Sequence, residues 1–258
     1  MNFLKKMLPK IYIILVPGTH ATIVYAQVHY KNSVIKQFDR QSFESASSLK
    51  NYIQTLERES TLSYIVLLAC HAKQGLLSSC TLQDGVDMSS VEKVCYDHSW
   101  GIYMDKDDIF ELQKQYRGVG LDLLFSPYTL LTFEHREMIK QISALYLLIT
   151  PKYMVAMVFK DKEAYFAEKL EMPEELEREE SQTVSEHHIK NIEQLVKQFY
   201  KESSNKMFIE SIIIADATGL DATFEHTLEE RLFVEVTKET FSVEETLISL
   251  ANEELGCQ

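Results

Sequence analysis

The chain has 258 residues, 45% of them hydrophobic, which is enough to form a sizeable core in one or two domains. Acidic side chains outnumber basic ones by 39 to 26, and the formal net charge of -13 argues against a nucleic-acid partner, because phosphate contacts need a basic face. The four cysteines lack the close CxxC spacing of a zinc or redox site, and a chain of this size needs no disulfide to fold. We therefore expect reduced thiols in a cytosol.

The first predicted element is a short apolar segment, residues 11–16, which follows several lysines. Such a start faintly resembles a secretory signal, and an exported domain is one alternative interpretation. However, Pro17 and Gly18 end the apolar run after about half a dozen residues, which is too short for a signal core or a membrane span. We therefore predict a buried strand.

This segment has a near-copy in the middle of the chain: Ile11–Pro17 (IYIILVP) returns as Leu145–Pro151 (LYLLITP). Each copy is followed by two more strand-like stretches and then by a helix. These stretches are 22–29 and 33–38 in the first half, and 154–159 and 164–170 in the second. A repeat of this length predicts two copies of one mixed α/β unit packed against each other.

The rest of each half can be read in chain order from apolar periodicity and helix signals. In the first half we predict a helix at 46–59, an apolar strand at 62–70, an insertion after about residue 71, a helix starting at Asp105, Asp107 and Asp108, a strand at 121–125 and a helix at 126–141. In the second half we predict an acidic linker at about 173–184, a helix at 189–203, a strand at 208–215, a helix at 223–232, a strand at 233–236 and a helix at 243–255. The expected domains are 1–143 and 144–258.

Three antiparallel strands followed by helix, strand, helix and strand form the plan of the actin-like ATPase and ribonuclease-H-like folds. The segment Ile209–Leu220, followed by Phe224, Leu228 and Glu229–Val236, resembles the end of PilM. The resemblance implies an α/β, actin-like (ribonuclease-H-like) duplicated fold. PilM, with the cytoplasmic part of the GspL proteins, forms the cytoplasmic clamp of type IV pilus and type II secretion machines.

The nucleotide motifs of that fold are missing here. An actin-like ATPase places Asp-x-Gly at the hairpin after the first strand of each half, where backbone N–H groups hold phosphate and the carboxylate holds hydrated magnesium. Here neither hairpin has an acid, and a proline removes a donor from each. A degenerate nucleotide cleft would be lined by Pro17, Gly18, Thr19, Pro151, Lys152, Asp216, Ala217 and Gly219. We therefore predict a pseudo-ATPase with no catalytic residues, no cofactor and no metal.

Other motifs carry less weight. Glu186-His187-His188 suggests a metal site, but adjacent histidines on a helix point in different directions and no third ligand is evident. Asp97-His98-Ser99 has the letters of a catalytic triad, yet sequence neighbours seldom meet as nucleophile, base and orienting group. Asp216-Ala217-Thr218-Gly219 differs from an aspartic-protease motif by an inserted alanine.

The resemblance implies a cytoplasmic scaffold, peripheral to the inner membrane and attached to it only indirectly. Its expected partner is the N-terminal cytoplasmic tail of an inner-membrane PilN-like protein, gripped near the strands and the helix at 46–59. A motor or assembly ATPase and self-association are further expectations. The machine is a pilus, a secretion or DNA-uptake apparatus, or a flagellar motor with pilus-like parts.

The alternative is an active actin-like ATPase or sugar-type kinase with atypical phosphate loops. It requires Asp39, Asp84 and Asp216 to converge on magnesium.

Overall fold

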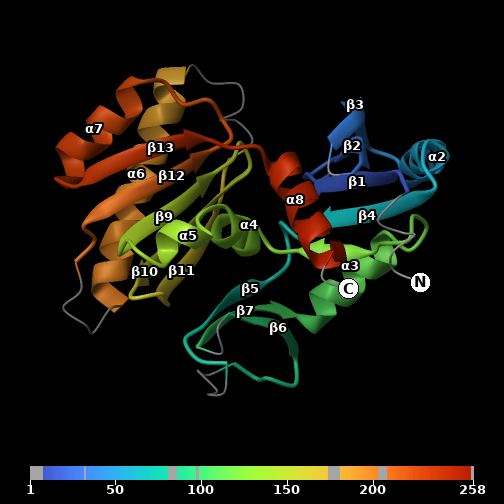
Figure 1. Ribbon diagram of the computed structural model, residues 1–258. Helices are drawn as coiled ribbons and strands as arrows, with labels where there is room; N and C mark the ends of the chain where they lie inside the picture. The colour runs from blue at the N-terminus through green and yellow to red at the C-terminus, as the bar shows by residue number, and fades with distance from the viewer. Residues whose placement is uncertain are drawn as a thin grey trace.

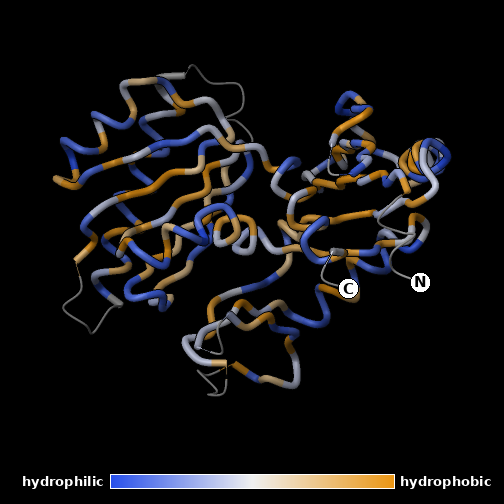
Figure 2. Tube along the Cα trace, in the orientation of Figure 1, coloured by the Kyte–Doolittle hydropathy of each residue, from blue (hydrophilic) through white to orange (hydrophobic). Residues whose placement is uncertain are grey.

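The computed structural model describes residues 8–31, 33–80, 86–96, 99–173, 181–202 and 208–256. Within these ranges the chain forms two five-stranded sheets and one three-stranded sheet. The two large sheets lie in two lobes, with the small sheet below and between them (Figure 1). Apolar residues concentrate along the strands of both large sheets (Figure 2).

The first large sheet has the strand order β3-β2-β1-β4-β8. Its strands are β1 (Lys10–Pro17), β2 (Thr22–Tyr30), β3 (Ser33–Phe43), β4 (Leu62–Leu68) and β8 (Leu123–Phe125), and its helices are α2 (Ala46–Glu57) and α3 (Lys106–Gln115). Leu49, Ile53 and Leu56 of α2 are buried against one face of this sheet. At the start of α3 the carboxylate of Asp105 accepts a hydrogen bond from the Asp107 N–H, as expected of an N-cap.

The second large sheet repeats this order as β11-β10-β9-β12-β13. Its strands are β9 (Ala144–Ile149), β10 (Tyr153–Lys160), β11 (Glu163–Glu171), β12 (Ser211–Asp216) and β13 (Glu235–Thr240), and its helices are α6 (Ser181–Glu202) and α7 (Thr223–Leu232). The two apolar copies in the sequence form β1 and β9, the central strand of each sheet. The predicted duplication is therefore confirmed, and the antiparallel trio comes first in each half.

The two halves exchange helices. Helix α4 (Pro127–Glu134) precedes the second half in sequence but contacts β9 and β10, whereas α8 (Val243–Gly256) ends the chain and contacts β1 and β4. The two helices also contact each other between the lobes (Figure 1). Tyr12 Oη donates a hydrogen bond of 2.9 Å to Asn252 Oδ1. A single apolar cluster consequently includes strands of both large sheets.

The insertion after β4 is the small sheet, ordered β5-β7-β6, with β5 (Gln74–Leu77), β6 (Val91–Tyr96) and β7 (Trp100–Asp105). It packs against the second half, because Trp100 Nε1 donates a hydrogen bond of 3.1 Å to the Lys162 carbonyl and the Trp100 ring contacts Phe159. The insertion thus joins the two lobes.

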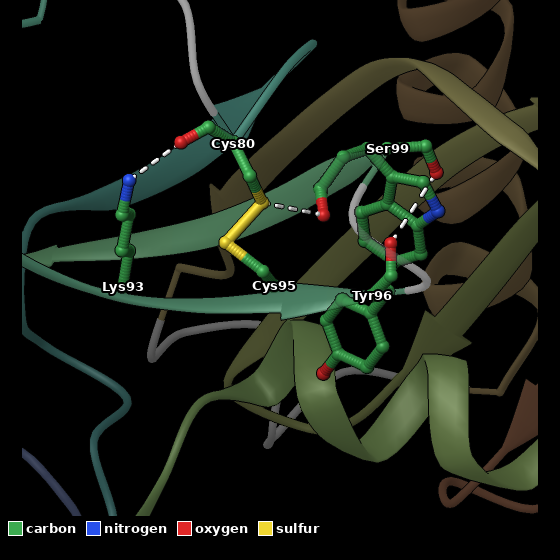
Figure 3. The surroundings of a disulfide bond; sticks show 6 residues. Cys80, Lys93, Cys95, Tyr96 and Ser99 are labelled. Carbon is green, nitrogen blue, oxygen red and sulfur yellow. Dashed lines mark hydrogen bonds between the residues drawn. A yellow bond between two sulfur atoms is a disulfide. The ribbon is translucent and has the colours of Figure 1, made fainter.

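A disulfide joins Cys80 to Cys95 in this insertion (Figure 3). Lys93, on the same strand as Cys95, donates a hydrogen bond of 2.6 Å to the Cys80 carbonyl. The expectation of reduced thiols is therefore wrong for this pair. The reason is that the β6–β7 hairpin brings the strand of Cys95 beside the segment that follows β5.

Three predicted boundaries are also wrong. The helix expected at 126–141 divides at His135 into α4 and α5 (Arg136–Ile139). The strand expected at 233–236 begins at Glu235, because Phe233 adopts a left-handed conformation (φ 56°) at the end of α7. Helix α6 already begins at Ser181, inside the expected linker. Among the described helices, none has both the length and the apolar character needed to cross a bilayer.

Candidate functional site

The loops of the predicted nucleotide cleft come together at one edge of the two large sheets. Strand β12 pairs in parallel with β9, so that Asp216 lies beside Ile149, and the Ala217 N–H donates a hydrogen bond of 2.9 Å to the Ile149 carbonyl. This places the loop after β12 next to the hairpin that carries Pro151 and Lys152. The hairpin of the first half reaches the same place, because Gly18 and Lys152 are in contact.

The Lys152 side chain fills the space beside the first hairpin. A Cβ atom built on Gly18 would overlap the Lys152 Nζ, and it would lie 2.9 Å from the Ala21 carbonyl oxygen. The Gly18 N–H already donates to that carbonyl, at 2.8 Å. The absence of a side chain at Gly18 thus leaves room for the Lys152 ammonium group, and the Gly18 N–H is used within its own turn. Thr19, the next residue, is exposed.

In the second hairpin, the Thr150 hydroxyl oxygen accepts hydrogen bonds from the N–H groups of Lys152 (3.3 Å) and Tyr153 (3.0 Å), and the hydroxyl itself donates to the Tyr153 carbonyl at 2.8 Å. Thr150 is buried. Both N–H groups belong to the hairpin that the sequence predicts as part of a nucleotide cleft, where free backbone donors would be needed for phosphate. A side chain of the same loop therefore satisfies them.

The third loop is closed in the same way. The buried Asp216 carboxylate accepts hydrogen bonds from the N–H groups of Thr218 (2.8 Å), Gly219 (3.2 Å) and Leu220 (2.8 Å), and from the Thr218 hydroxyl. Lys238 Nζ lies 3.8 Å from Asp216 Oδ2 and donates to the Leu220 carbonyl. Asp216 thus organises its own turn and has a cation partner. Gly219 is the open part of the loop, with a φ of 76° and empty space where a Cβ would lie.

Deeper between the lobes lie Cys70, Tyr153 and Lys169. Lys169 Nζ donates to the Cys70 carbonyl and forms an ion pair of 2.7 Å with Glu171, which links the second half to the end of β4. Burial raises the pKa of the Cys70 thiol to about 12 and raises the pKa of Tyr153 well above its usual value. Neither group is ionised near neutral pH, so Cys70 is a poor nucleophile here.

Those remaining sequence candidates that the structure describes do not assemble into sites. His188 points into the protein from α6, and burial lowers its pKa to about 4, whereas Glu186 faces Arg231 of α7 at 2.8 Å. Asp39 is exposed on β3, the edge strand of the first large sheet, whereas Asp216 ends β12 of the second large sheet. Asp84, Asp97 and His98 lie outside the described residues. In the described part of the chain, no three acidic, histidine or cysteine side chains group as metal ligands do.

Among the residues that the structure describes, a groove of about 630 Å³ lies between the small sheet and the first half. Its walls come from β6 and β7, the edge strand β8, helices α4 and α5, and the last turns of α8. Apolar and aromatic side chains dominate it, including Val94, Tyr96, Trp100, Phe133, Ile139 and Leu250. No residue of α2 lines this groove, so it is a different surface from the one expected near the strands and the helix at 46–59, and that expectation stays a prediction.

The groove has a structured floor and a charged rim. The rings of Tyr96 and Trp100 stack with their centroids 4.3 Å apart. At the rim, Arg136 Nη1 contacts Glu253 Oε2 at 2.7 Å, and Lys140 and Lys162 lie nearby along the lining. Val94 is 58% exposed although it lines the groove. Such a surface suits a ligand with apolar side chains and some polar backbone.

Sequence reasoning missed Thr150, Lys169 and Lys238, which close the loops and join the lobes. Thr150 had a readable signal, because a threonine followed by proline favours a local side-chain turn. The two lysines had none, since their partners are distant in sequence. The groove was also missed, because its residues come from five separate segments.

Comparison with known families gives two matches. One model, a domain of unknown function (DUF8569), matches residues 8–132, and a second domain of unknown function (DUF8341) matches residues 180–256. Comparison with curated proteins gives no match.

Several solved structures share the architecture. A Bacteroides thetaiotaomicron protein with an actin-like ATPase fold and unknown function aligns with a TM-score of 0.61 at 10% identity, covering 100% of this chain and 99% of that one. A PilM–PilN type IV pilus biogenesis complex aligns with a TM-score of 0.55 at 11% identity, covering 95% of each chain. MreB5 of Spiroplasma citri bound to ADP aligns with a TM-score of 0.55 at 8% identity, covering 95% of this chain and 97% of that one.

With its duplicated sheets, exchanged helices and interlobe loops, the protein is of the α/β class and has the actin-like ATPase fold. PilM is among its structural neighbours. At these identities the likeness concerns the fold alone, so the function has to be argued from the site.

Proposed function

We propose that this protein is a PilM-like scaffold that binds an extended peptide tail of a membrane protein. The observation that carries the proposal is the apolar groove beside the small sheet. Two edge strands, β6 and β8, border it, and edge strands and exposed apolar side chains are what an extended peptide recognises. The similar architecture of a PilM–PilN complex makes a PilN-like tail the first partner to test.

The proposal includes a pseudo-ATPase. It is supported by the hydrogen bonds within the three loops. The Thr150 hydroxyl accepts from the backbone N–H groups of its own hairpin, and the Asp216 carboxylate accepts from those of its own turn. In the other hairpin, Lys152 occupies the space beside Gly18. A nucleoside triphosphate could bind only if these contacts were broken. In the competing proposal, an active actin-like ATPase or kinase, the same loops would rearrange around magnesium and phosphate.

The finer parts of the proposal concern place and partners. The scaffold would be cytoplasmic, peripheral to the inner membrane, and divided into domains at 1–143 and 144–258. It would couple the tail to a motor or assembly ATPase in a pilus, a secretion or DNA-uptake apparatus, or a flagellar motor, with self-association as a further feature. The disulfide requires a thiol-oxidising environment or a kinetically protected bond, so its presence in purified protein bears on the cytoplasmic location.

The test is peptide binding by fluorescence polarisation, with the cytoplasmic tail of the PilN-like protein from the same genome. Val94→Glu places a charge in the groove and should weaken binding about tenfold or more. Val34→Glu is the matched control, because Val34 is similarly exposed (51%, against 58% for Val94) but lies on β3, outside the groove. Equal binding by both variants, or no binding by the wild type, would remove the groove proposal.

A second measurement separates pseudo-ATPase from enzyme. Thermal shift with ATP and magnesium should leave the melting temperature unchanged, since a ligand stabilises a protein only if it binds the folded state. A clear rise in melting temperature, together with ATP hydrolysis, would favour the enzyme.

A further inference from the structure

Charge is distributed unevenly along this acidic chain. Its first 40 residues contain one acidic side chain, Asp39, against the basic residues Lys5, Lys6, Lys10, Lys31, Lys36 and Arg40. All the other acidic side chains, of 39 in total, lie after this segment. The segment that forms β1, β2 and β3 is therefore basic, whereas the rest of the protein is strongly acidic.

Exposed apolar side chains lie in the same segment. Leu8 and Tyr30 are each 37% exposed, Val34 is 51% exposed and Ile35 is 58% exposed. We call these four residues, with Lys10, Lys31 and Lys36, the amino-end patch.

Strand register brings the patch together at one end of the first sheet. Lys10 of β1 pairs with His29 of β2, and His29 pairs with Val34 of β3, so the three residues lie in one row. Leu8 precedes this row by two residues and Tyr30 follows it directly. The register shifts beside His29, which leaves Ile35 as an extra residue in β3. This irregularity also makes the edge of β3 a poor template for another strand.

Two lysines of the patch lie on aromatic rings, and one of them is also beside an acid. Lys31 Nζ is 5.3 Å from the centroid of the Tyr30 ring, and Lys36 Nζ is 4.6 Å from that of Phe38. Lys36 also pairs with Glu59 at the end of α2, at 2.6 Å. Lysines that flank exposed aliphatic and aromatic side chains are the combination found on surfaces that lie on anionic bilayers.

We propose that the amino-end patch binds directly to the surface of a bilayer that contains anionic lipids. Tyr30, Val34 and Ile35 enter the interfacial region, and the lysines are attracted to the lipid head groups. The acidic remainder of the protein is repelled by the same surface, which orients the chain with its second half away from the membrane. This contact differs from the groove and does not depend on the peptide that the groove binds.

The experiment is vesicle flotation with the full-length protein. Vesicles of phosphatidylcholine alone are compared with vesicles that also contain phosphatidylglycerol. The wild type should float with the phosphatidylglycerol vesicles, less so at high salt, and should stay behind with phosphatidylcholine alone. Lys31→Asn removes a charge and keeps a residue that tolerates the positive φ of 48°, so the fold should survive. It should lower the partition coefficient about fivefold, and a Val34→Ser/Ile35→Ser variant should lower it further.

Two controls separate this proposal from the previous one. Val94→Glu, which tests the groove, and Lys190→Gln, which removes an exposed lysine of α6, should both leave flotation unchanged. Melting temperatures close to that of the wild type show that each variant is folded. Absence of flotation with anionic vesicles, or flotation that the patch variants do not weaken, overturns the proposal. Binding of the patch to an acidic protein, without binding to any vesicle, would also overturn the proposal.

Discussion

The two halves of this protein have the same strand order but differ in what they add to it. The first half carries the small sheet, the disulfide and most of the groove, whereas the described residues of the second half, apart from α8, form five sheet strands with helices α6 and α7. The two hairpins differ as well: one has Gly18 beside a lysine from the other half, and the other is closed by Thr150. A duplicated framework thus conserves its core while its surface features diverge, because packing constrains strand order more than loop chemistry.

The two halves are not independent, because both contribute to one shared apolar core. Leu247 of α8 is fully buried in the cluster shared by both large sheets, whereas Leu228 of α7 is fully buried in a cluster of the second half.

Leu247→Ala should lower the free energy of unfolding by about 2–5 kcal/mol, the usual cost of such a cavity. Hydrogen exchange should then accelerate in β1 and β4 as well as in the second half. Leu228→Ala is the matched control, with a similar cost but faster exchange confined to β9–β13. Identical exchange patterns in the two variants would contradict the shared core.

Loss of the disulfide should destabilise the small sheet. Cys80 and Cys95 are 15 residues apart, and closing a loop of that length is worth about 3 kcal/mol. Reductant should therefore speed hydrogen exchange in β5–β7 and weaken peptide binding in the groove. A Cys80→Ser/Cys95→Ser variant is the control, since reductant should not change it further. If reductant leaves β6 and β7 protected, the bond does not hold the insertion.

Acid should destabilise the protein through two buried histidines. Burial lowers the pKa values of His135 and His188 to about 4, from an ordinary value of 6.5. As pH falls below 6.5, the two histidines become protonated in the unfolded chain but stay neutral in the folded protein. The free energy of unfolding therefore decreases progressively between pH 6.5 and pH 4. The loss should be on the order of 1–3 kcal/mol for each histidine.

Urea unfolding at a series of pH values measures this effect. His188→Leu should flatten the decline between pH 6.5 and 4, whereas replacement of the exposed His226 by glutamine should not. A decline of equal slope in His188→Leu would show that other groups cause it.

Thr150→Val should have the smallest effect on stability, about 1–3 kcal/mol, because it leaves the N–H groups of Lys152 and Tyr153 without their buried acceptor. Thr19→Val changes the same residue type on the other hairpin, where the side chain is exposed, and should stay within about 0.5 kcal/mol. Thermal unfolding of both variants measures the difference between the hairpins. Equal melting temperatures would mean that the Thr150 cap contributes nothing.

The sequence alone determined the duplicated framework. Ile11–Pro17 and Leu145–Pro151 are continuous apolar runs, and strands covered on both faces must be apolar throughout, so β1 and β9 could be predicted without a structure. The neighbouring positions of the loops after β9 and β12 followed from the same order of elements, because the ends of parallel strands meet at one edge, whereas a nucleotide cleft at these loops stays a prediction.

Tertiary structure decided the rest. Strand β6 exposes most of its side chains and therefore has no apolar pattern that marks it as a strand, and the Cys80–Cys95 bond depends on how its hairpin folds back. The groove collects residues from segments as distant as Val94 and Leu250. Local patterns report which face of an element is buried, but contacts between distant segments depend on packing, which is settled only when the whole chain folds.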